Sequence, residues 1–347
     1  HSHLHIKNPG RIQHRNPADY HSPFFFHLRK KLLHQLVKTL TDVKVPAGIV
    51  YTEISEEHPG MNPAFLEYTD GYLREEEIED EKGNILVVPE IYCERTARYQ
   101  NLSVYIWWLS VDNYLIHNSF VDRRRANGTL RAIKALLTGK LKDKTDFVKK
   151  AKMHLCQSYY AIHYLETIGI SGKQVRYLSD YVNDICLAGE EAALREKKED
   201  VVLYNPKKGA AFTKALREMA QDLRWVPLIG MTTEEMRSCM SKSKVYIDFG
   251  NHPGKDRIPR EAAISGCIVI TGKRGAAAFA EDVCIPETYK FDESCAKKED
   301  IISCIRDCIC NFDVHKVDFD GYRSYIRNEH QQFTADVKKI FVNEDYI

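Results

Sequence analysis

The chain has 347 residues, of which 44% are hydrophobic and 29% charged, and its formal net charge is +1. Because the chain is not basic overall, a protein that coats nucleic acid by charge is not indicated. No apolar run reaches the roughly 20 residues of a transmembrane helix, and no signal-peptide pattern is visible. Ten scattered cysteines without a second group of metal ligands are typical of buried thiols in a reducing, cytosolic compartment.

The first half of the chain alternates short apolar runs with helical patterns. The runs predicted to be buried strands are Leu4 to Lys7, Ala47 to Tyr51, Asn84 to Pro89, Leu102 to Leu109, Met153 to Cys156 and Val175 to Leu178. Apolar residues recur every four positions from Phe24 to Leu40, which predicts a helix. Further helices are predicted over Glu94 to Gln100 and Tyr159 to Thr167. Strands that alternate with helices predict a doubly wound, Rossmann-like parallel sheet.

The second half repeats this alternation, so the fold class is α/β with two parallel sheets. Its predicted strands are Val201 to Tyr204, Arg224 to Ile229, Val245 to Ile247 and Cys267 to Thr271. Small and charged residues fill 188–200, and we place the domain boundary there. The expected parts are an N-terminal domain over 1–189, a C-terminal domain over 190–321, and a terminal helix over 322–347 that returns to the first domain.

One segment of the first domain, 122–152, differs in charge from the rest. It holds eleven Lys and Arg residues against three Asp, and Leu130, Ile133, Leu136, Leu137 and Leu141 form an amphipathic stripe. One interpretation is a solvated helical face. The other is a patch within 123–152 that docks on an anionic bilayer or a polyanionic acceptor. The sequence leaves both open, and nucleic acid is the weakest of the candidate partners.

The stretch Lys244 to Gly272 predicts an anion site. A buried strand leads into a polar loop, and Pro259 is expected at the first position of the following helix. Glu261 is expected in the first turn, where the helix dipole favours a carboxylate, and Gly266 ends the helix. The loop thereby brings its cations to a helix N-terminus, which is the usual geometry of a phosphate site.

Ligands of open parallel sheets bind beyond the carboxyl ends of the strands, so the loops of the second domain supply the candidate residues. Cations there neutralise a diphosphate, and carboxylates suit sugar or ribose hydroxyls. The predicted binding set is Lys207, Lys208, Thr232, Lys255, Arg257 and Glu261. For Lys207 and Lys208 a solvated loop is an equal alternative. Thr232 is also expected to cap its helix, with Glu235 as its partner.

Polar residues also follow strands of the first domain. Asp112 comes after the most apolar strand and is the leading candidate for a general base. Glu90 and Asn113 follow strands in the same way and are predicted to bind the second substrate. For each of these residues, capping of the next helix is an equally good interpretation.

Other familiar patterns are missing or weak. No GxGxxG fingerprint follows a strand and no GxxxxGK[ST] loop occurs, which argues against an NAD enzyme and a P-loop NTPase. Asp318-Phe319-Asp320 precedes the terminal helix, so we interpret this pair as a cap rather than a metal site. The sequence therefore predicts neither a metal nor a cofactor.

These residues resemble those of bacterial glycosyltransferases of the GT-B fold. The second domain is similar to the nucleotide-sugar half of the glycogen-synthase-like group, family 4, in Tyr204 to Gly209, Val245 to Asp248 and Pro259 to Gly266. The string HPGKDRIPREAA also resembles a signature of a narrower set of polysaccharide-locus transferases. The resemblance covers about residues 200 to 290 well and the first domain only as another Rossmann-like half.

The resemblance implies roles for the matched positions. Glu261 would hold the ribose hydroxyls of the donor nucleotide and Lys208 its diphosphate, without a bound metal. The group has a glutamate eight positions before Glu261, where this chain has Pro253. His252 and Asp256 are the nearest substitutes and join Asp112 as catalytic candidates. Whether the reaction retains or inverts the sugar linkage stays open.

We therefore expect a metal-independent glycosyltransferase that uses a nucleotide-sugar donor. Its acceptor would be a saccharide or lipid-linked saccharide in the synthesis of a surface polysaccharide, lipopolysaccharide or capsule. The expected location is cytoplasmic, with peripheral attachment to the inner face of the cytoplasmic membrane. Two alternatives remain: a sugar-nucleotide 2-epimerase, and a non-catalytic sugar- or polyanion-binding protein, which Pro253 favours.

Overall fold

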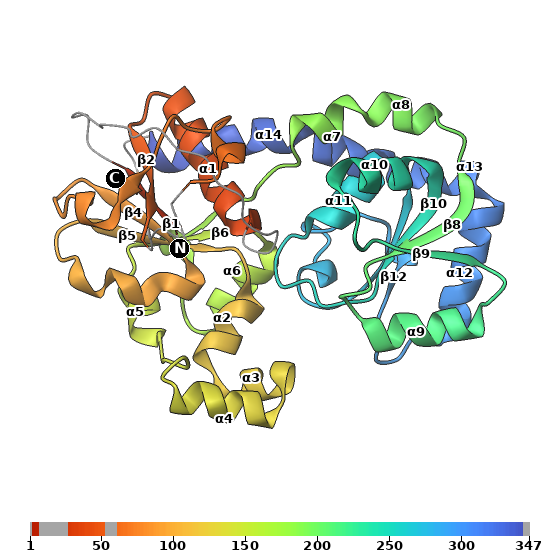
Figure 1. Cartoon of the computed structure of the whole chain (residues 1–347), viewed down its shortest axis with the longest axis horizontal. Coiled ribbons are helices and arrows are strands. Elements are labelled where there is room, and N and C mark those ends of the chain that lie inside the picture. The colour runs from red at the N-terminus through yellow and green to blue at the C-terminus, as the bar shows by residue number, and fades with distance from the viewer. Residues whose placement is uncertain (1, 7–26, 53–60, 343–347) are drawn as a thin grey trace. The chain divides into compact units, whose positions relative to one another are not determined.

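A computed structural model describes residues 2–6, 27–52 and 61–342, and the chain divides into two compact units (Figure 1). Unit 1 holds the described residues up to Gln157, residues 161–180, and those from Gln332 onward. Unit 2 holds Ser158–Tyr160 and Tyr181–Gln331. None of the described helices is both long enough and apolar enough to cross a bilayer.

The sheet of unit 1 has seven strands in the order β3-β2-β1-β4-β5-β6-β7. Their bounds are β1 (Ser2–Ile6), β2 (Ala47–Tyr51), β3 (Leu73–Arg74), β4 (Ile85–Pro89), β5 (Ser103–Trp108), β6 (Met153–Cys156) and β7 (Val175–Tyr177). Strand β1 pairs antiparallel with both β2 and β4, whereas the other pairs are parallel. The sheet is thus parallel except at β1, where the predicted direction was wrong. An apolar run indicates that a strand is buried but not which way it runs.

Unit 1 has six α-helices among its described residues. They are α1 (His27–Asp42), α2 (Val111–Asn118), α3 (Phe120–Asn127), α4 (Thr129–Leu137), α5 (Thr145–Lys150) and α6 (Tyr159–Thr167), the last beginning with two residues of unit 2. Of these, α1 and α6 were predicted, and α4 lies in the amphipathic stripe. Leu32, Leu36 and Leu40 are buried on α1, although residues 24–26 of the predicted helix lie outside the described residues. A 3-10 helix, Glu90–Arg98, takes the place of the helix predicted over Glu94 to Gln100.

The core of unit 1 centres on two tryptophans of β5. Trp107 and Trp108 are fully buried, and each indole N–H has an acceptor. Trp107 donates to the carbonyl of Leu178 at 2.9 Å and Trp108 to Nδ1 of His154 at 3.0 Å. Burial lowers the pKa of His154 to about 4, so the imidazole is neutral and can accept this hydrogen bond.

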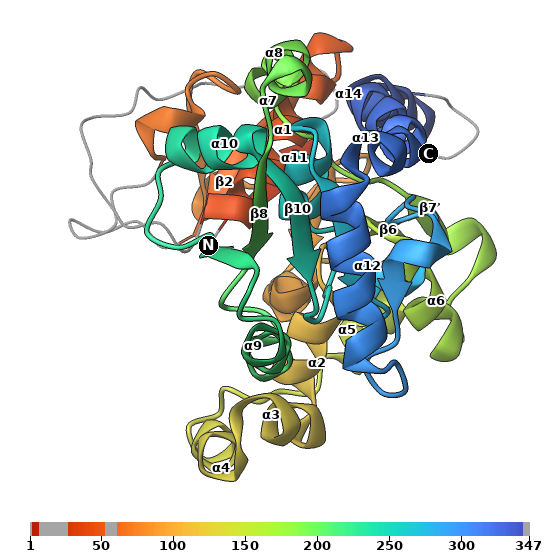
Figure 2. The same cartoon turned by 90° about the vertical axis from the view of Figure 1, so that its right-hand side faces the viewer.

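Unit 2 has a fully parallel sheet of five strands in the order β12-β11-β10-β8-β9 (Figure 2). Its strands are β8 (Glu199–Tyr204), β9 (Arg224–Pro227), β10 (Ser243–Asp248), β11 (Ile268–Gly272) and β12 (Lys290–Phe291). Its helices are α7 (Asp184–Ala188), α8 (Glu190–Arg195), α9 (Ala210–Met219), α10 (Thr233–Lys242), α11 (Arg257–Ile264), α12 (Lys298–Cys310), α13 (Phe312–His315) and most of α14 (Asp320–Phe341). Val202, Ile247 and Ile270 lie in the buried core of this sheet.

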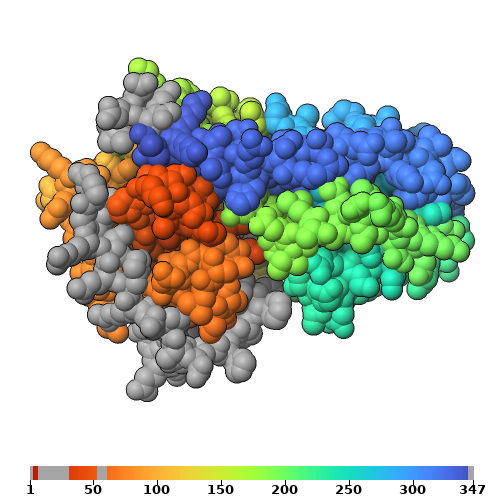
Figure 3. Space-filling model, turned by 90° about the horizontal axis from the view of Figure 1, so that it is seen from above, coloured from red at the N-terminus to blue at the C-terminus, as the bar shows by residue number. Residues whose placement is uncertain are grey.

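The division between the units lies at Asp180 and Tyr181, not at the compositional change near residue 190. Helices α7 and α8 pack on α10 and α11 of unit 2, and Cys186 belongs to its core. Figure 3 shows α7 and α8, in green, lying against the blue surface of α14, where Arg327 reaches Glu190 at 2.9 Å. The small and charged residues at 188–200, where we predicted the boundary, therefore lie within unit 2 and include the outer face of its helix α8. Helix α14 divides at Gln331, and its last residues, including Phe333 near Trp107, belong to unit 1.

Candidate functional site

Three loops at the carboxyl end of the unit 2 sheet meet through glycines. Gly209, which follows β8, has a φ of +52°, and a Cβ there would lie 1.6 Å from the carbonyl oxygen of Phe249. Gly275, which follows β11, has a φ of +60°, and a Cβ would lie 2.1 Å from the carbonyl oxygen of His252. That carbonyl accepts the N–H of Ala276 at 2.8 Å. Only glycine fits such close backbone contacts, so the loops after β8, β10 and β11 form one assembly.

We expect Gly209→Ala to lower the unfolding free energy by more than the cost of its left-handed backbone angle, because the new Cβ would also collide with Phe249. Gly230→Ala is a matched control, because Gly230 has a φ of +69° but nothing within 4 Å of its Cβ position. The control should lose about 1–2 kcal/mol of unfolding free energy, the cost of a left-handed residue. Gly209→Ala should lose clearly more in urea unfolding, and equal losses would contradict the close contact with Phe249.

Four charged or titratable side chains form a ring within this assembly, which we call the strand-end ring: Lys208, Asp248, His252 and Asp256. Lys208 makes an ion pair with Asp256, and its Nζ lies 3.9 Å from Oδ2 of Asp248. His252 lies between the two carboxylates, with Nδ1 at 2.9 Å from Asp256 and Nε2 at 3.7 Å from Asp248. His252 and Asp248 are buried. The ring therefore brings together the predicted Lys208, His252 and Asp256.

The electrostatics of the ring favour the ionised form of Asp256. Burial raises the pKa of Asp256, but the His252 hydrogen bond and the Lys208 charge outweigh it, so the pKa is lowered overall. Tyr246 donates its hydroxyl to Asp248 at 2.8 Å. Burial, followed by the Asp248 charge, holds the pKa of Tyr246 well above its usual value, so the hydroxyl remains a donor.

Helix α11 begins beside the ring, at Arg257, which corrects two details of the prediction. Pro259 is its third residue and Glu261 its fifth, so Glu261 lies past the first turn. A proline fits there because the first four N–H groups of a helix have no intrahelical partner. Asp256 is the N-cap residue, but its side chain makes no capping hydrogen bond. The end of the helix is as predicted, with Gly266 at a φ of +83°.

Arg257 and Glu261 pair with each other along α11. Nη2 of Arg257 lies 2.7 Å from Oε1 of Glu261, and both side chains are largely buried. The cation and the carboxylate predicted to contact a nucleotide are thus adjacent, one turn apart, and each lowers the cost of burying the other.

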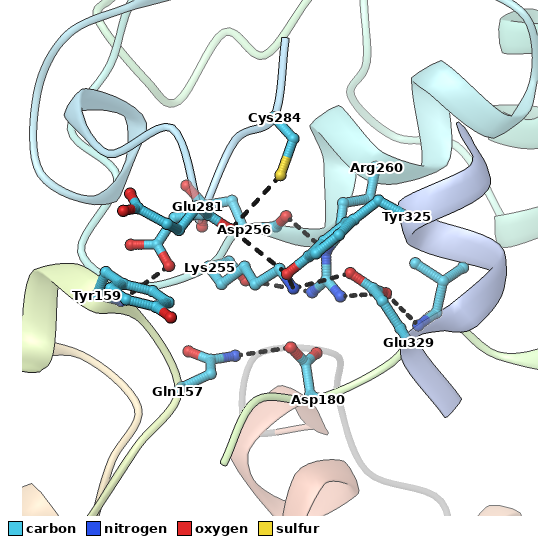
Figure 4. Close-up of polar contacts among 12 residues, drawn as sticks. Gln157, Tyr159, Asp180, Lys255, Asp256, Arg260, Glu281, Cys284, Tyr325 and Glu329 are labelled. Atoms are coloured by element: carbon cyan, nitrogen blue, oxygen red, sulfur yellow. Dashed lines mark hydrogen bonds and ion pairs between the residues drawn. The ribbon is translucent and has the colours of Figure 1, made fainter. Parts of the chain in front are cut away.

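Lys255, in contrast, extends toward α14 (Figure 4). Its ammonium lies 2.9 Å from Oε1 of Glu329 and donates to the hydroxyl of Tyr325 at 2.9 Å. Arg260, fully buried, reaches Oε2 of Glu329 at 2.8 Å and also donates to the carbonyls of Lys255 and Asp256. Glu329 in turn accepts the N–H of Val182 at 3.3 Å. We call Lys255, Arg260, Tyr325 and Glu329 the buried ion cluster; it fixes the loop after β10 to α14.

Sequence reasoning missed Asp248 and Glu329. A signal for Glu329 does exist, because it falls on the apolar stripe of the terminal helix, seven residues after Tyr322 and four before Phe333. A charge on a buried helical face needs a partner of opposite charge. Asp248 is the last residue of a strand, and the candidate residues were taken from the loops that follow the strands.

Lys207 and Thr232 lie on the exposed surface outside the ring. Thr232 forms the predicted capping box: its hydroxyl accepts the N–H of Glu235 at 3.2 Å, and the Glu235 carboxylate accepts the N–H of Thr232 at 2.7 Å. This confirms the cap, and any contact of Thr232 with a ligand would be additional to it.

The predicted residues of unit 1 follow β4 and β5. Glu90 is buried and accepts the N–H of Leu109 at 3.0 Å, so it joins the ends of the two strands. Ser110, not Asp112 or Asn113, is the N-cap of α2, and it accepts the N–H of Asn113 at 3.2 Å. Asp112 is the second residue of α2 and partly exposed. The capping role proposed as an alternative for Asp112 therefore belongs to Ser110.

No cluster of three or more metal-ligating side chains occurs among the residues that the structure describes. Asp318 accepts the hydroxyl of Tyr289, and Asp320 pairs with Arg323 at the start of α14. The ten cysteines carry no disulfide.

Neither the protein-family models nor the curated proteins include a match to this sequence. Among solved structures, sucrose-phosphate synthase from Thermosynechococcus elongatus has a TM-score of 0.55 at 12% identity, over 90% of this chain and 92% of that one. WaaG, a glycosyltransferase involved in lipopolysaccharide biosynthesis, gives 0.47 at 10% identity, over 72% and 80%. Anabaena HepE in complex with UDP and glucose gives 0.43 at 10% identity, over 69% and 72%.

The fold is the GT-B glycosyltransferase fold, as the likeness to the sucrose-phosphate synthase shows. This confirms the fold predicted from the sequence. At these identities the likeness concerns the fold alone, and the narrower resemblance to family 4 stays a prediction.

Proposed function

We propose that this protein is a glycosyltransferase that moves a sugar from a nucleotide-sugar donor to a saccharide or lipid-linked saccharide. The observation that carries the proposal is the strand-end ring, at the carboxyl end of a parallel sheet and beside the N-terminus of α11. A lysine and a helix N-terminus without a side-chain cap are groups that bind a diphosphate. The fold shared with a sucrose-phosphate synthase supports the same class of reaction.

Lys208 is the proposed ligand of the donor diphosphate. Its ammonium is held by Asp256 in the structure, so an incoming diphosphate competes with that carboxylate for the same cation. On transfer, Lys208 stabilises the charge that develops on the leaving nucleotide. Arg257 and Glu261 lie along α11 in positions suited to phosphate and ribose hydroxyls respectively.

The catalytic candidates take different roles in this scheme. His252 has no exposed surface, so it positions Asp256 rather than contacting substrate. Asp256 and Asp112 are the carboxylates left to act as bases or to bind the sugar. Lys255 supports the loop through Glu329 instead of binding the diphosphate directly. Glu90 and Asn113 stay proposed acceptor residues of unit 1, and Lys207 and Thr232 would contribute at the edge of the donor site.

The finer parts of the proposal concern the pathway and the cell. We place the reaction in surface-polysaccharide synthesis, either lipopolysaccharide or capsule. It would take place in the cytoplasm at the inner face of the cytoplasmic membrane, with no bound metal. The support is the resemblance of the HPGKDRIPREAA segment together with the basic segment of unit 1.

A thermal-shift panel of UDP-, GDP-, dTDP-, CMP- and ADP-sugars tests the donor. One of them should stabilise the chain, by about 2.7 kcal/mol at a concentration one hundred times its Kd, with and without EDTA. Stabilisation by none would make the non-catalytic alternative the better one. Loss of the shift in EDTA would overturn metal independence. Conversion of the nucleotide sugar alone into its 2-epimer would identify an epimerase.

A further inference from the structure

Helices α3 and α4 form a hairpin at one end of unit 1, which we call the basic hairpin (Figures 1 and 2). Gly128, with a φ of +83°, makes the turn between the two helices. Ser119 caps α3 by accepting the N–H of Asp122 at 3.3 Å. The hairpin is thus a defined structural element.

Helix α4 has its apolar residues on the outside. Ala132 and Ala135 are buried, with exposed fractions of 0% and 2%, on a helix that packs against α3. Leu130 and Leu137 are 85% and 81% exposed, and Ile133 is 41% exposed. Residues at i, i+3 and i+7 share one helical face, so Leu130, Ile133 and Leu137 form a ridge on the side opposite the alanines.

Exposed apolar side chains concentrate on this hairpin. Of the fifteen large hydrophobic residues exposed in the described part of the chain, five lie between residues 121 and 137: Val121, Leu130, Ile133, Leu136 and Leu137. Single exposed hydrophobic residues are ordinary, but a contiguous group marks an interaction site.

Cations surround the ridge. Residues 119–142 contain seven Lys and Arg residues and one Asp, so their net charge is +6. Arg131 and Lys134 are exposed on α4 itself, beside the leucines. Lys144, just beyond, is buried against Glu94 at 2.9 Å and takes no part. Lys149, Lys150 and Lys152 are also exposed but lie outside the hairpin, so the charge beside the ridge is that of residues 119–142.

We propose that the basic hairpin docks on an anionic bilayer, with the leucine ridge inserted between the headgroups and the cations on lipid phosphates. Such a membrane contact does not depend on the proposed sugar transfer. A leucine ridge flanked by cations matches the interface of an anionic membrane. A soluble polyanion would leave the leucines in water, and a second hairpin of the same charge would be repelled.

The test is co-sedimentation of the full chain with vesicles of phosphatidylcholine, with and without about 30% phosphatidylglycerol, at low and high salt. The wild-type chain should bind the anionic vesicles at low salt and release them at high salt. Leu130→Ser/Leu137→Ser should weaken binding at least about ten-fold, because leucine insertion is lost. Val314→Ser/Val317→Ser, which alters exposed residues of unit 2, should bind as the wild type does.

The charge is tested in parallel. Arg131→Gln/Lys134→Gln should weaken binding to anionic vesicles about 25-fold, since each cation near such a surface contributes about five-fold. Lys338→Gln/Lys339→Gln, an exposed pair on α14, is the matched control. The proposal is overturned if the wild type ignores anionic vesicles, or if the leucine variant binds them equally well. It is also overturned if that variant instead abolishes a dimer seen by ultracentrifugation. Donor binding should be unchanged in every variant, so this outcome is separate from that of the transferase proposal.

Discussion

Replacing Glu329 by glutamine is expected to lower the unfolding free energy by about 3–5 kcal/mol. Glutamine keeps the size of the side chain but removes the carboxylate that pairs with both Lys255 and Arg260 in the buried ion cluster. Both cations are buried in unit 2, so the loss leaves charge in a poorly solvated place. Urea unfolding at neutral pH measures the effect.

Asp336→Asn supplies the control on the same helix. Burial raises the pKa of Asp336, so its ionised form is disfavoured by folding and the neutral amide should cost less than about 1 kcal/mol. A further variant, Lys255→Met/Arg260→Met/Glu329→Leu, should recover much of the stability lost in Glu329→Gln, because it removes both unbalanced cations and puts apolar side chains in their place. A loss below 1 kcal/mol in Glu329→Gln would mean that the cluster does not hold the loop.

Periodicity and capping rules predicted the regular elements of this chain well. The strands near Ile85, Ser103 and Met153, the capping box at Thr232 and the glycine stop at Gly266 all follow from local sequence. The antiparallel direction of β1 does not, because strand direction depends on how the chain returns to the sheet. The boundary near residue 190 misled for a similar reason: a charged composition marks an outer helical face as readily as it marks a linker.

The site was predictable in part. The rule that ligands bind at strand ends picked out Lys208 and Asp256, which the structure brings together with His252. The rule could not predict where the Lys255 ammonium lies, because Glu329, the partner of Lys255, is on α14 and distant in the sequence. Neighbouring cations in one loop can therefore have different roles: Lys208 at the ring, and Lys255 in the support of the loop.

Replacing Lys208 by methionine is expected to reduce kcat/KM for sugar transfer about 10²–10³-fold, measured with the nucleotide sugar that stabilises the chain. The ammonium would no longer balance Asp256 and Asp248, so the approaching diphosphate would meet two carboxylates without a cation. Part of the loss should appear in kcat, because Lys208 stabilises charge on the leaving nucleotide. Lys207→Met is the matched control: this neighbouring lysine is exposed and outside the ring, and its loss should change kcat/KM only a few-fold. Equal effects of the two substitutions would remove Lys208 from the donor site and leave the strand-end ring as a purely structural feature.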